Sequence, residues 1–154
     1  KQVAKFWRKF ENVSRRGSAV QIALDNTLNR VKGMRTALAQ SKADGGDLDT
    51  RLYKLRMKLL DLDEALNGNR SKMGPGEKTN PNVGSRLFVV SRVLEFSTYG
   101  PTTTAKEGLA IAEEQLDTIQ EKIEKNQKAL SAMGRELMKA GAPWVEGEAL
   151  PKNR

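Results

Sequence analysis

At 154 residues the chain has the size of one ordinary domain, long enough to bury a hydrophobic core without disulfides or a structural metal. It contains neither cysteine nor histidine, which excludes Cys/His zinc sites, disulfide frameworks, thiol nucleophiles and histidine-dependent catalytic relays. The net charge is +8, and residues 1–40 account for most of it, with nine Lys and Arg against two acidic residues. Any nucleic-acid interpretation therefore depends on this first segment.

Apolar residues recur at spacings of three and four from Val3 to Leu38, a pattern typical of one long amphipathic helix or two nearly collinear ones. Any bend in this segment is expected at residues 15–18, because a glycine inside a helix costs about 1 kcal/mol relative to alanine. The segment begins with cations alternating with aromatics. We interpret Phe6, Trp7 and Phe10 as core residues or as the docking face for an upstream domain, with a membrane surface or a nucleic-acid backbone as the alternative.

Residues 41–46 are predicted to form a loop, and Asp47 is placed to cap the helix that follows. Leucines spaced by three and four from Leu48 to Leu66 predict a shorter second helix that buries one seam. The periodicity then disappears. Residues 67–82 are rich in turn formers and are predicted to be a long exposed loop.

A third, short helix is predicted to start at Pro81 and to end near Phe96. Its apolar positions cover more than half of its circumference: Val83, Leu87, Phe88, Val89, Val90, Val93, Leu94 and Phe96. A helix that is apolar on most of its faces is usually buried. We therefore expect this helix to be the most buried element of the fold.

A fourth, long helix is predicted from the apolar period between Ala105 and Leu137, with Thr104 and Glu107 at the spacing of a capping box. Asn126 interrupts its seam and is either a buried amide that fixes the helix register or a solvated residue on a rotated helix. Four helices, two long and two shorter, indicate an all-α, mainly antiparallel four-helix bundle formed by residues 1–154 as a single domain.

Gly141 is predicted as the C-cap of the fourth helix, and residues 141–154 as an extended C-terminal tail. Trp144 in this tail is interpreted as a cover for the last apolar turn of the bundle, with ligand stacking as the alternative. It joins Phe6, Trp7 and Phe10 as a candidate residue for interdomain docking.

The last helix carries a cluster of carboxylates that we tested as catalytic or metal-binding groups: Glu113, Asp117, Glu121 and Glu124. A di-iron bundle needs Glu-x-x-His on two helices, and this chain has no histidine. Two of the carboxylates also have a lysine four residues later, an arrangement typical of a solvated helix face. We therefore predict no catalytic residue, no metal site and no cofactor.

Four short motifs occur together: Val3-Ala4-Lys5-Phe6-Trp7 with Leu28-Asn29-Arg30-Val31; Leu66-Asn67-Gly68; Pro81 with Arg86; and Pro101-Thr102 followed by Ala140-Gly141-Ala142-Pro143-Trp144. Over nearly the whole chain they resemble the C-terminal helical domain of bacterial BNR-repeat, sortilin-like β-propeller proteins, often labelled glycosyl hydrolases. The resemblance implies a preceding β-propeller, sometimes a β-sandwich, and a periplasmic or otherwise exported location. The propeller motif Ser-x-Asp-x-Gly-x-x-Trp is absent here, so a hydrolase activity would belong to other domains.

No stretch is long and apolar enough for a membrane span, so we expect a soluble chain. Because it opens on Lys1 and not on methionine, we favour a piece of a longer polypeptide. The expected function is a non-catalytic structural or interaction bundle that docks on the preceding domain through the first helix or the long loop. The alternative is a nucleic-acid or anionic-surface binder acting through Lys1, Lys5, Arg8, Lys9, Arg15, Arg16, Arg30, Lys32 and Arg35.

Overall fold

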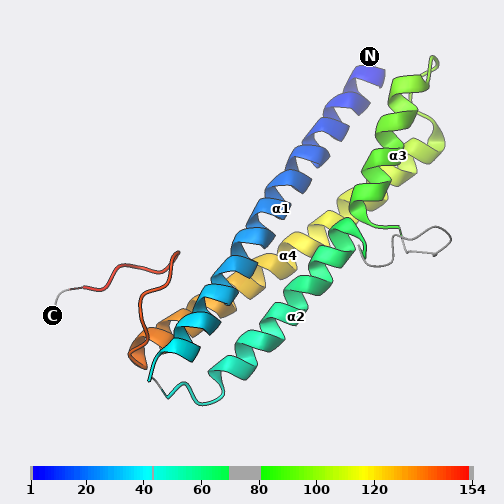
Figure 1. Cartoon of the computed structure of the whole chain (residues 1–154). Coiled ribbons are helices and arrows are strands. Elements are labelled where there is room, and N and C mark those ends of the chain that lie inside the picture. The colour runs from blue at the N-terminus through cyan, green and yellow to red at the C-terminus, as the bar shows by residue number, and fades with distance from the viewer. Residues whose placement is uncertain (1, 43, 70–80, 153–154) are drawn as a thin grey trace. The chain divides into compact units, whose positions relative to one another are not determined.

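The computed structural model of the chain describes residues 2–42, 44–69 and 81–152. These residues form four α-helices and no strand (Figure 1): α1 (Gln2–Gln40), α2 (Leu48–Asn67), α3 (Val83–Phe96) and α4 (Thr103–Lys139). The predicted all-α, four-helix fold with two long and two shorter helices is confirmed. None of the described helices has the length and hydropathy needed to cross a membrane. Most of the loop predicted over residues 67–82 lies outside the described residues.

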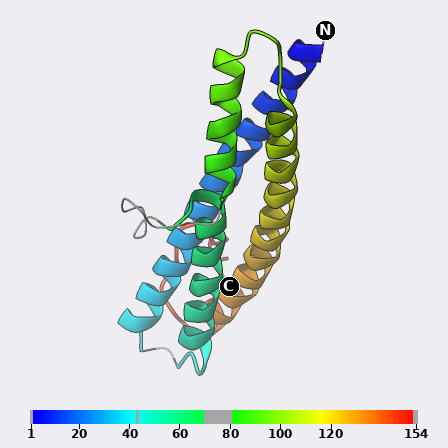
Figure 2. The same ribbon diagram turned by 90° about the vertical axis from the view of Figure 1, so that its right-hand side faces the viewer.

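The helices form two compact units, Lys1–Ile22 with Leu62–Glu121 (unit 1) and Ala23–Asp61 with Lys122–Arg154 (unit 2). Both long helices, α1 and α4, contribute to each unit, whereas α3 belongs to unit 1 and most of α2 to unit 2. Figures 1 and 2 show that α1 and α4 run in the same direction, and that the third helix of each unit runs opposite to both. Two of the three helix pairs in each unit are therefore antiparallel.

The predicted apolar seams of α2 and α4 form the core. Every leucine of the α2 stripe from Leu48 to Leu66 is buried, as is every predicted seam position of α4 from Ala105 to Leu137. The α1 stripe is buried at most of its positions, but Val3 at its start is 43% exposed. Of the two alternatives for this segment, one long helix is the correct one, since α1 continues without a break through Gly17. A Cβ at Gly17 would lie 3.9 Å from Leu87 Cδ1, an ordinary van der Waals distance, so this glycine faces α3 without a close approach.

Two polar side chains of the unit 2 core are buried, Thr27 and Asn126. Asn126 is 9% exposed, so the buried alternative for this residue is the correct one. Thr27 Oγ1 donates to the Ala23 carbonyl at 2.6 Å and accepts from Gln127 Nε2 at 3.3 Å, which satisfies its hydroxyl inside the bundle.

The expectation that α3 is the most buried element is wrong. The buried residues of this helix are Val83, Val90 and Leu94, whereas Phe88, Val89 and Phe96 are 64%, 53% and 71% exposed. The reason is geometric, because a helix packed against one side of a three-helix unit can bury only one stripe, however apolar its other faces are. Apolar side chains are therefore left on the outside of α3.

The starts of α3 and α4 differ from the predicted ones by one or two residues. Asn82 is the N-cap of α3: its side chain accepts from the Ser85 N–H, and the Ser85 hydroxyl accepts from the Asn82 N–H, so Pro81 precedes the cap and does not open the helix. For α4, Thr102 Oγ1 accepts from the Ala105 N–H at 3.1 Å. The capping box expected at Thr104 and Glu107 is therefore wrong.

The end of α4 follows the prediction. Gly141 has a positive φ of 85°, its N–H donates to the Met138 carbonyl, and the Ala142 N–H donates to the Leu137 carbonyl. This pair of hydrogen bonds is a Schellman motif, which needs a glycine at this position because other residues rarely adopt the left-handed conformation. Gly141 sets the direction in which the tail leaves α4.

Candidate docking and anion-binding surfaces

The aromatic residues at the start of α1 divide into core and surface. Phe6 is buried at 9% exposure and belongs to the core of unit 1. Trp7 and Phe10 are half-buried and pack edge to face, with their ring centroids 6.0 Å apart and an interplanar angle of 81°. Of the three predicted docking aromatics of α1, only Trp7 and Phe10 present part of their rings to solvent.

A further aromatic residue lies at the same end of unit 1, in the connection between α3 and α4. Tyr99 is fully exposed, and a Cβ on the next residue, Gly100, would lie 3.1 Å from Val3 Cγ2. The connection therefore touches the start of α1. We name Val3, Trp7, Phe10 and Tyr99 the N-terminal apolar surface.

Trp144, the fourth predicted docking residue, is 48% exposed, and its indole N–H donates to the Glu148 carbonyl at 3.2 Å. The residue that packs against the bundle is its neighbour Val145, which is buried and lies on Gly33 of α1, where a Cβ would be 3.0 Å from Val145 Cγ1. The first part of the tail, which we expected to be extended, thus turns back onto α1.

Glu148 holds this returning segment in place through an ion pair. Its Oε1 accepts from Arg30 Nη2 at 2.7 Å, and the two side chains are only 10% and 24% exposed. Gly134 of α4 makes room for the carboxylate, since a Cβ there would lie 2.6 Å from Glu148 Oε2. Gly147, with φ +91°, packs on the Arg30 side chain. Sequence reasoning missed this contact between α1, α4 and the tail.

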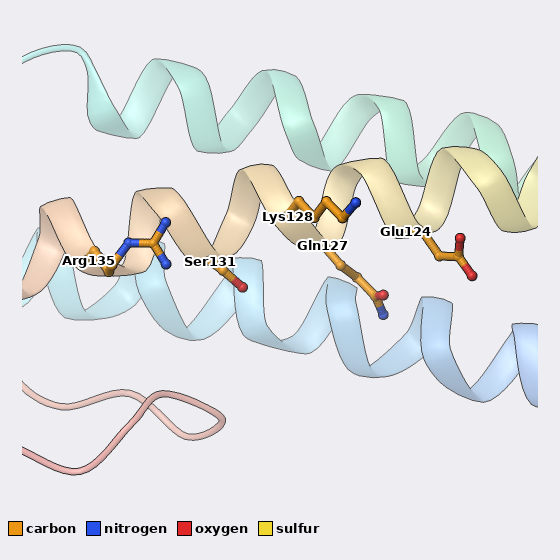
Figure 3. A pocket seen from close by; sticks show the side chains of 5 residues that line it. All are labelled: Glu124, Gln127, Lys128, Ser131 and Arg135. Atoms are coloured by element: carbon orange, nitrogen blue, oxygen red, sulfur yellow. The ribbon is translucent and has the colours of Figure 1, made fainter.

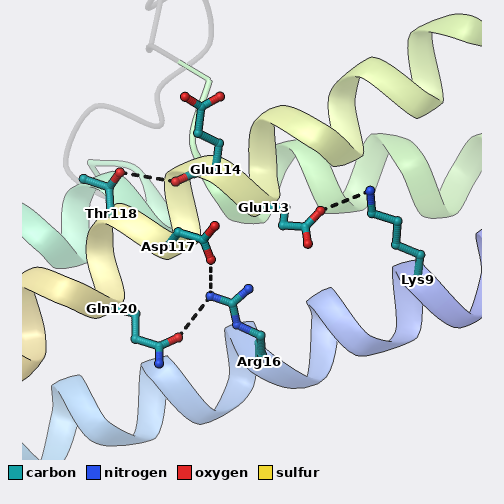
Figure 4. Close-up of polar contacts among 7 residues, drawn as sticks. All are labelled: Lys9, Arg16, Glu113, Glu114, Asp117, Thr118 and Gln120. Carbon is teal, nitrogen blue, oxygen red and sulfur yellow. Dashed lines mark hydrogen bonds and ion pairs between the residues drawn. The ribbon is translucent and has the colours of Figure 1, made fainter.

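Part of the basic charge of α1 is paired with the carboxylates of α4 inside unit 1 (Figure 4). Lys9 Nζ lies 3.1 Å from Glu113 Oε2, and Arg16 Nη2 lies 2.5 Å from Asp117 Oδ1 and 3.0 Å from the Gln120 side-chain oxygen. Two of the four carboxylates considered for catalysis therefore serve as partners of surface cations. Within the described part of the chain, no cluster of three or more His, Cys, Asp or Glu side chains could hold a metal ion.

A shallow hollow of about 430 Å³ lies along one face of α4 in unit 2 (Figure 3). Its lining residues are Glu124, Gln127, Lys128, Ser131 and Arg135. Glu124, Lys128 and Arg135 are exposed, and both signs of charge occur along the hollow. A wide, mixed-charge surface does not exclude water from a reacting group, so its geometry does not favour catalysis.

A larger groove of about 810 Å³ lies between α1 and α2 in unit 2, and we name it the basic groove. Its lining residues are Lys32, Arg35, Thr36, Leu38, Ala39, Asp49 and Arg56. The lining contains three cationic side chains and one carboxylate. That carboxylate belongs to Asp49 and lies 3.0 Å from Arg35 Nε. The Arg35 guanidinium also lies 5.4 Å from the centre of the half-exposed Tyr53 ring.

The sequence indicated Lys32 and Arg35 as part of the basic first helix, but it gave no reason to group Arg56 or Tyr53 with them. These α2 residues join the cluster only because α2 packs beside α1 in unit 2. Nearby on α2, Arg51 pairs with Glu136 at 2.8 Å, and the hydrogen bond to Glu136 raises the pKa of Arg51, which stays positively charged.

Comparisons with protein-family models, with curated proteins and with solved structures found no match to this chain.

Proposed function

We propose that this chain is a non-catalytic interaction bundle that packs against a β-propeller or β-sandwich domain of the same polypeptide. The resemblance to the C-terminal helical domain of BNR-repeat, sortilin-like proteins supports this proposal, and it makes the parent an exported protein labelled a glycosyl hydrolase. The hydrolytic chemistry, where present, belongs to the propeller. The bundle contributes a docking surface and a stable terminal unit.

The observation that carries the proposal is the N-terminal apolar surface. Val3 is 43% exposed and Tyr99 is fully exposed. The rings of Trp7 and Phe10 are partly exposed to solvent beside them. Aromatic residues gathered at an exposed site are typical of the centre of a protein interface. This surface lies at the start of α1, next to the position where the family places the preceding domain.

The test begins with the coding sequence upstream of Lys1, where we expect several propeller repeats. The propeller region, produced separately, is expected to bind the purified bundle, and binding is measured by calorimetry. Val3→Ser combined with Tyr99→Ser is expected to weaken the affinity about tenfold or more, since this corresponds to about 1.4 kcal/mol of lost interface contact. Both residues are exposed, so the fold is expected to be retained.

The matched control is Ile22→Ser, which removes an exposed apolar side chain of α1 outside the N-terminal apolar surface and is expected to leave the affinity unchanged. The proposal fails if no propeller repeat is encoded upstream, or if Ile22→Ser weakens binding as much as the double variant. Turnover of an aryl glycoside by the purified bundle, above a control without protein, would show that the chain is catalytic.

A second function is favoured by one observation, the basic groove. Lys32 and Arg56 line it together with Arg35, which is paired with Asp49 and lies over the half-exposed Tyr53 ring. A cationic groove with an aromatic residue is typical of sites that follow a single-stranded nucleic-acid backbone. Lys9, Arg16 and Arg30 of α1 contribute less, because they are already paired with carboxylates of α4 and the tail.

For this second function, we expect a fluorescently labelled single-stranded DNA to bind at low salt and to lose roughly tenfold in affinity for a fourfold rise in salt concentration, as two or three phosphate contacts require. Lys32→Glu with Arg56→Glu is expected to abolish binding, measured by fluorescence anisotropy. Lys54→Glu with Lys58→Glu, at two exposed α2 positions outside the groove, changes the net charge by the same amount and is the control for net charge. Equal losses in both variants would mean that binding follows overall charge and that the groove is no specific site.

A further inference from the structure

The outward side of α3 carries apolar side chains that are exposed and that no other described element of unit 1 covers. We name Phe88, Val89, Arg92, Glu95 and Phe96 the α3 outer face. All five are exposed, and at 100° per residue they share one side of the helix, opposite to the buried Val83, Val90 and Leu94. A helix that packs by one stripe normally has a polar outer side, and large exposed apolar patches mark interaction sites.

The two charges on the α3 outer face have opposite signs and lie one turn apart. The Arg92 guanidinium stacks over the Phe96 ring, 4.7 Å from its centroid, which leaves the N–H groups in the guanidinium plane available to a carboxylate. Among the residues that the structure describes, neither Arg92 nor Glu95 takes part in an ion pair. No described residue of the same chain therefore supplies an ionic partner for either charge.

The pattern is self-complementary. If a second α3 packs antiparallel to the first about a two-fold axis near Arg92, then Phe88 of each copy lies opposite Phe96 of the other. At about 1.5 Å of rise per residue, Arg92 is then only about 4.5 Å along the axis from Glu95 of the second copy, within reach of an ion pair. The same operation brings the two Arg92 side chains together near the axis, where the two Glu95 carboxylates compensate their like charges, and it pairs both aromatic residues.

The available area sets the strength of such a contact. The three apolar side chains expose roughly 300–400 Å² per copy, because a fully exposed aromatic side chain presents on the order of 200 Å². With the stems of Arg92 and Glu95, two copies would bury about 1,000 Å² in total, slightly below the range of stable specific interfaces. The contact is therefore expected to form reversibly as the concentration rises.

We propose that the α3 outer face is the interface of a weak, two-fold symmetric homodimer of this chain. The partner is a second copy, because the face supplies both halves of each contact, the Arg92–Glu95 ion pair and the Phe88–Phe96 aromatic pair. The proposal does not depend on docking to a neighbouring domain, which uses the N-terminal apolar surface.

The test is analytical ultracentrifugation of the full chain from roughly 10 µM to 1 mM, which covers the dissociation constants of a weak dimer. The wild-type chain is expected to shift from monomer toward dimer. Phe88→Ser, Arg92→Glu and Glu95→Arg, each changing an exposed residue, are each expected to weaken association at least tenfold. Arg135→Glu, an exposed charge reversal in unit 2, is the control that should dimerise like the wild type.

The deciding experiment mixes the two charge-reversal variants. An equimolar mixture of Arg92→Glu and Glu95→Arg brings two negative charges against two positive ones, so a heterodimer is expected where each variant alone is monomeric. The double variant Arg92→Glu/Glu95→Arg is likewise expected to recover the homodimer. A wild-type chain that stays monomeric over the whole range, or a mixture that associates no better than its components, overturns the proposal.

Discussion

Leu130→Ala is expected to lower the free energy of unfolding by about 2–5 kcal/mol, the cost of truncating a leucine in a closely packed core. Leu130 is fully buried in unit 2, on the α4 seam. The loss has two parts, the transfer free energy of the removed methyl groups and the cavity left behind. A value near the upper limit would mean that the surrounding helices do not close on the cavity.

The measurement is urea unfolding followed by far-ultraviolet circular dichroism. Leu150→Ala is the matched control, since the same atoms are removed from a side chain that is 75% exposed, and its effect is expected to stay within about 0.5 kcal/mol. A Leu130→Ala variant as stable as the wild type would contradict the seam assignment for α4.

The helices themselves were predictable because their apolar periods are long and regular. The seam of α4 continues from Ala105 to Leu137 with one polar interruption, and even that residue, Asn126, is buried. An apolar period that continues over many turns places its residues on one face of a helix. It therefore predicts both the helix and the side of it that is buried. The α2 leucines behave in the same way.

The burial of α3 could not be predicted, because it depends on how many neighbours the helix has. An apolar pattern that covers most of a helix fits a helix surrounded by others and equally a helix with one side reserved for a partner. The buried residues of α3 in unit 1 are Val83, Val90 and Leu94, whereas Phe88 and Phe96 remain exposed. The cap positions missed by one or two residues are a smaller matter, since several hydroxyl and amide residues at each helix start were suitable.

The candidate surfaces were predicted only where one helix determines them. The cations and aromatics at the start of α1 are adjacent in sequence and could be singled out, although Phe6 proved to be core. The basic groove needs α2 beside α1, and the tail contact joins Arg30 to Glu148 across more than 100 residues. The apolar period of one segment carries no information on which residue of a distant segment it will meet. Contacts of this kind can therefore be identified only from the three-dimensional structure.

Glu148→Ala is expected to release the tail and to lower the free energy of unfolding by about 1–3 kcal/mol, because it leaves the largely buried Arg30 without its carboxylate. Among the described residues, Glu148 is the carboxylate that pairs with this guanidinium, and none of them accepts a hydrogen bond from Arg30 Nε. The cost is below that of a fully buried pair, since the Arg30 side chain is 24% exposed and water can reach it in part. Urea unfolding gives the free energy, and cleavage by chymotrypsin after Trp144 reports release of the tail.

The control for this change is Asp49→Ala, which breaks an ion pair of similar length between Arg35 and a carboxylate that is 58% exposed. Solvent screens such a pair, so its loss is expected to cost at most about 1 kcal/mol and to leave cleavage after Trp144 unchanged. If the two variants lose the same free energy of unfolding, the buried Arg30–Glu148 pair stabilises the fold no more than an exposed ion pair does. If Glu148→Ala loses stability without faster cleavage, Val145 on Gly33 holds the tail and the ion pair acts only on α1.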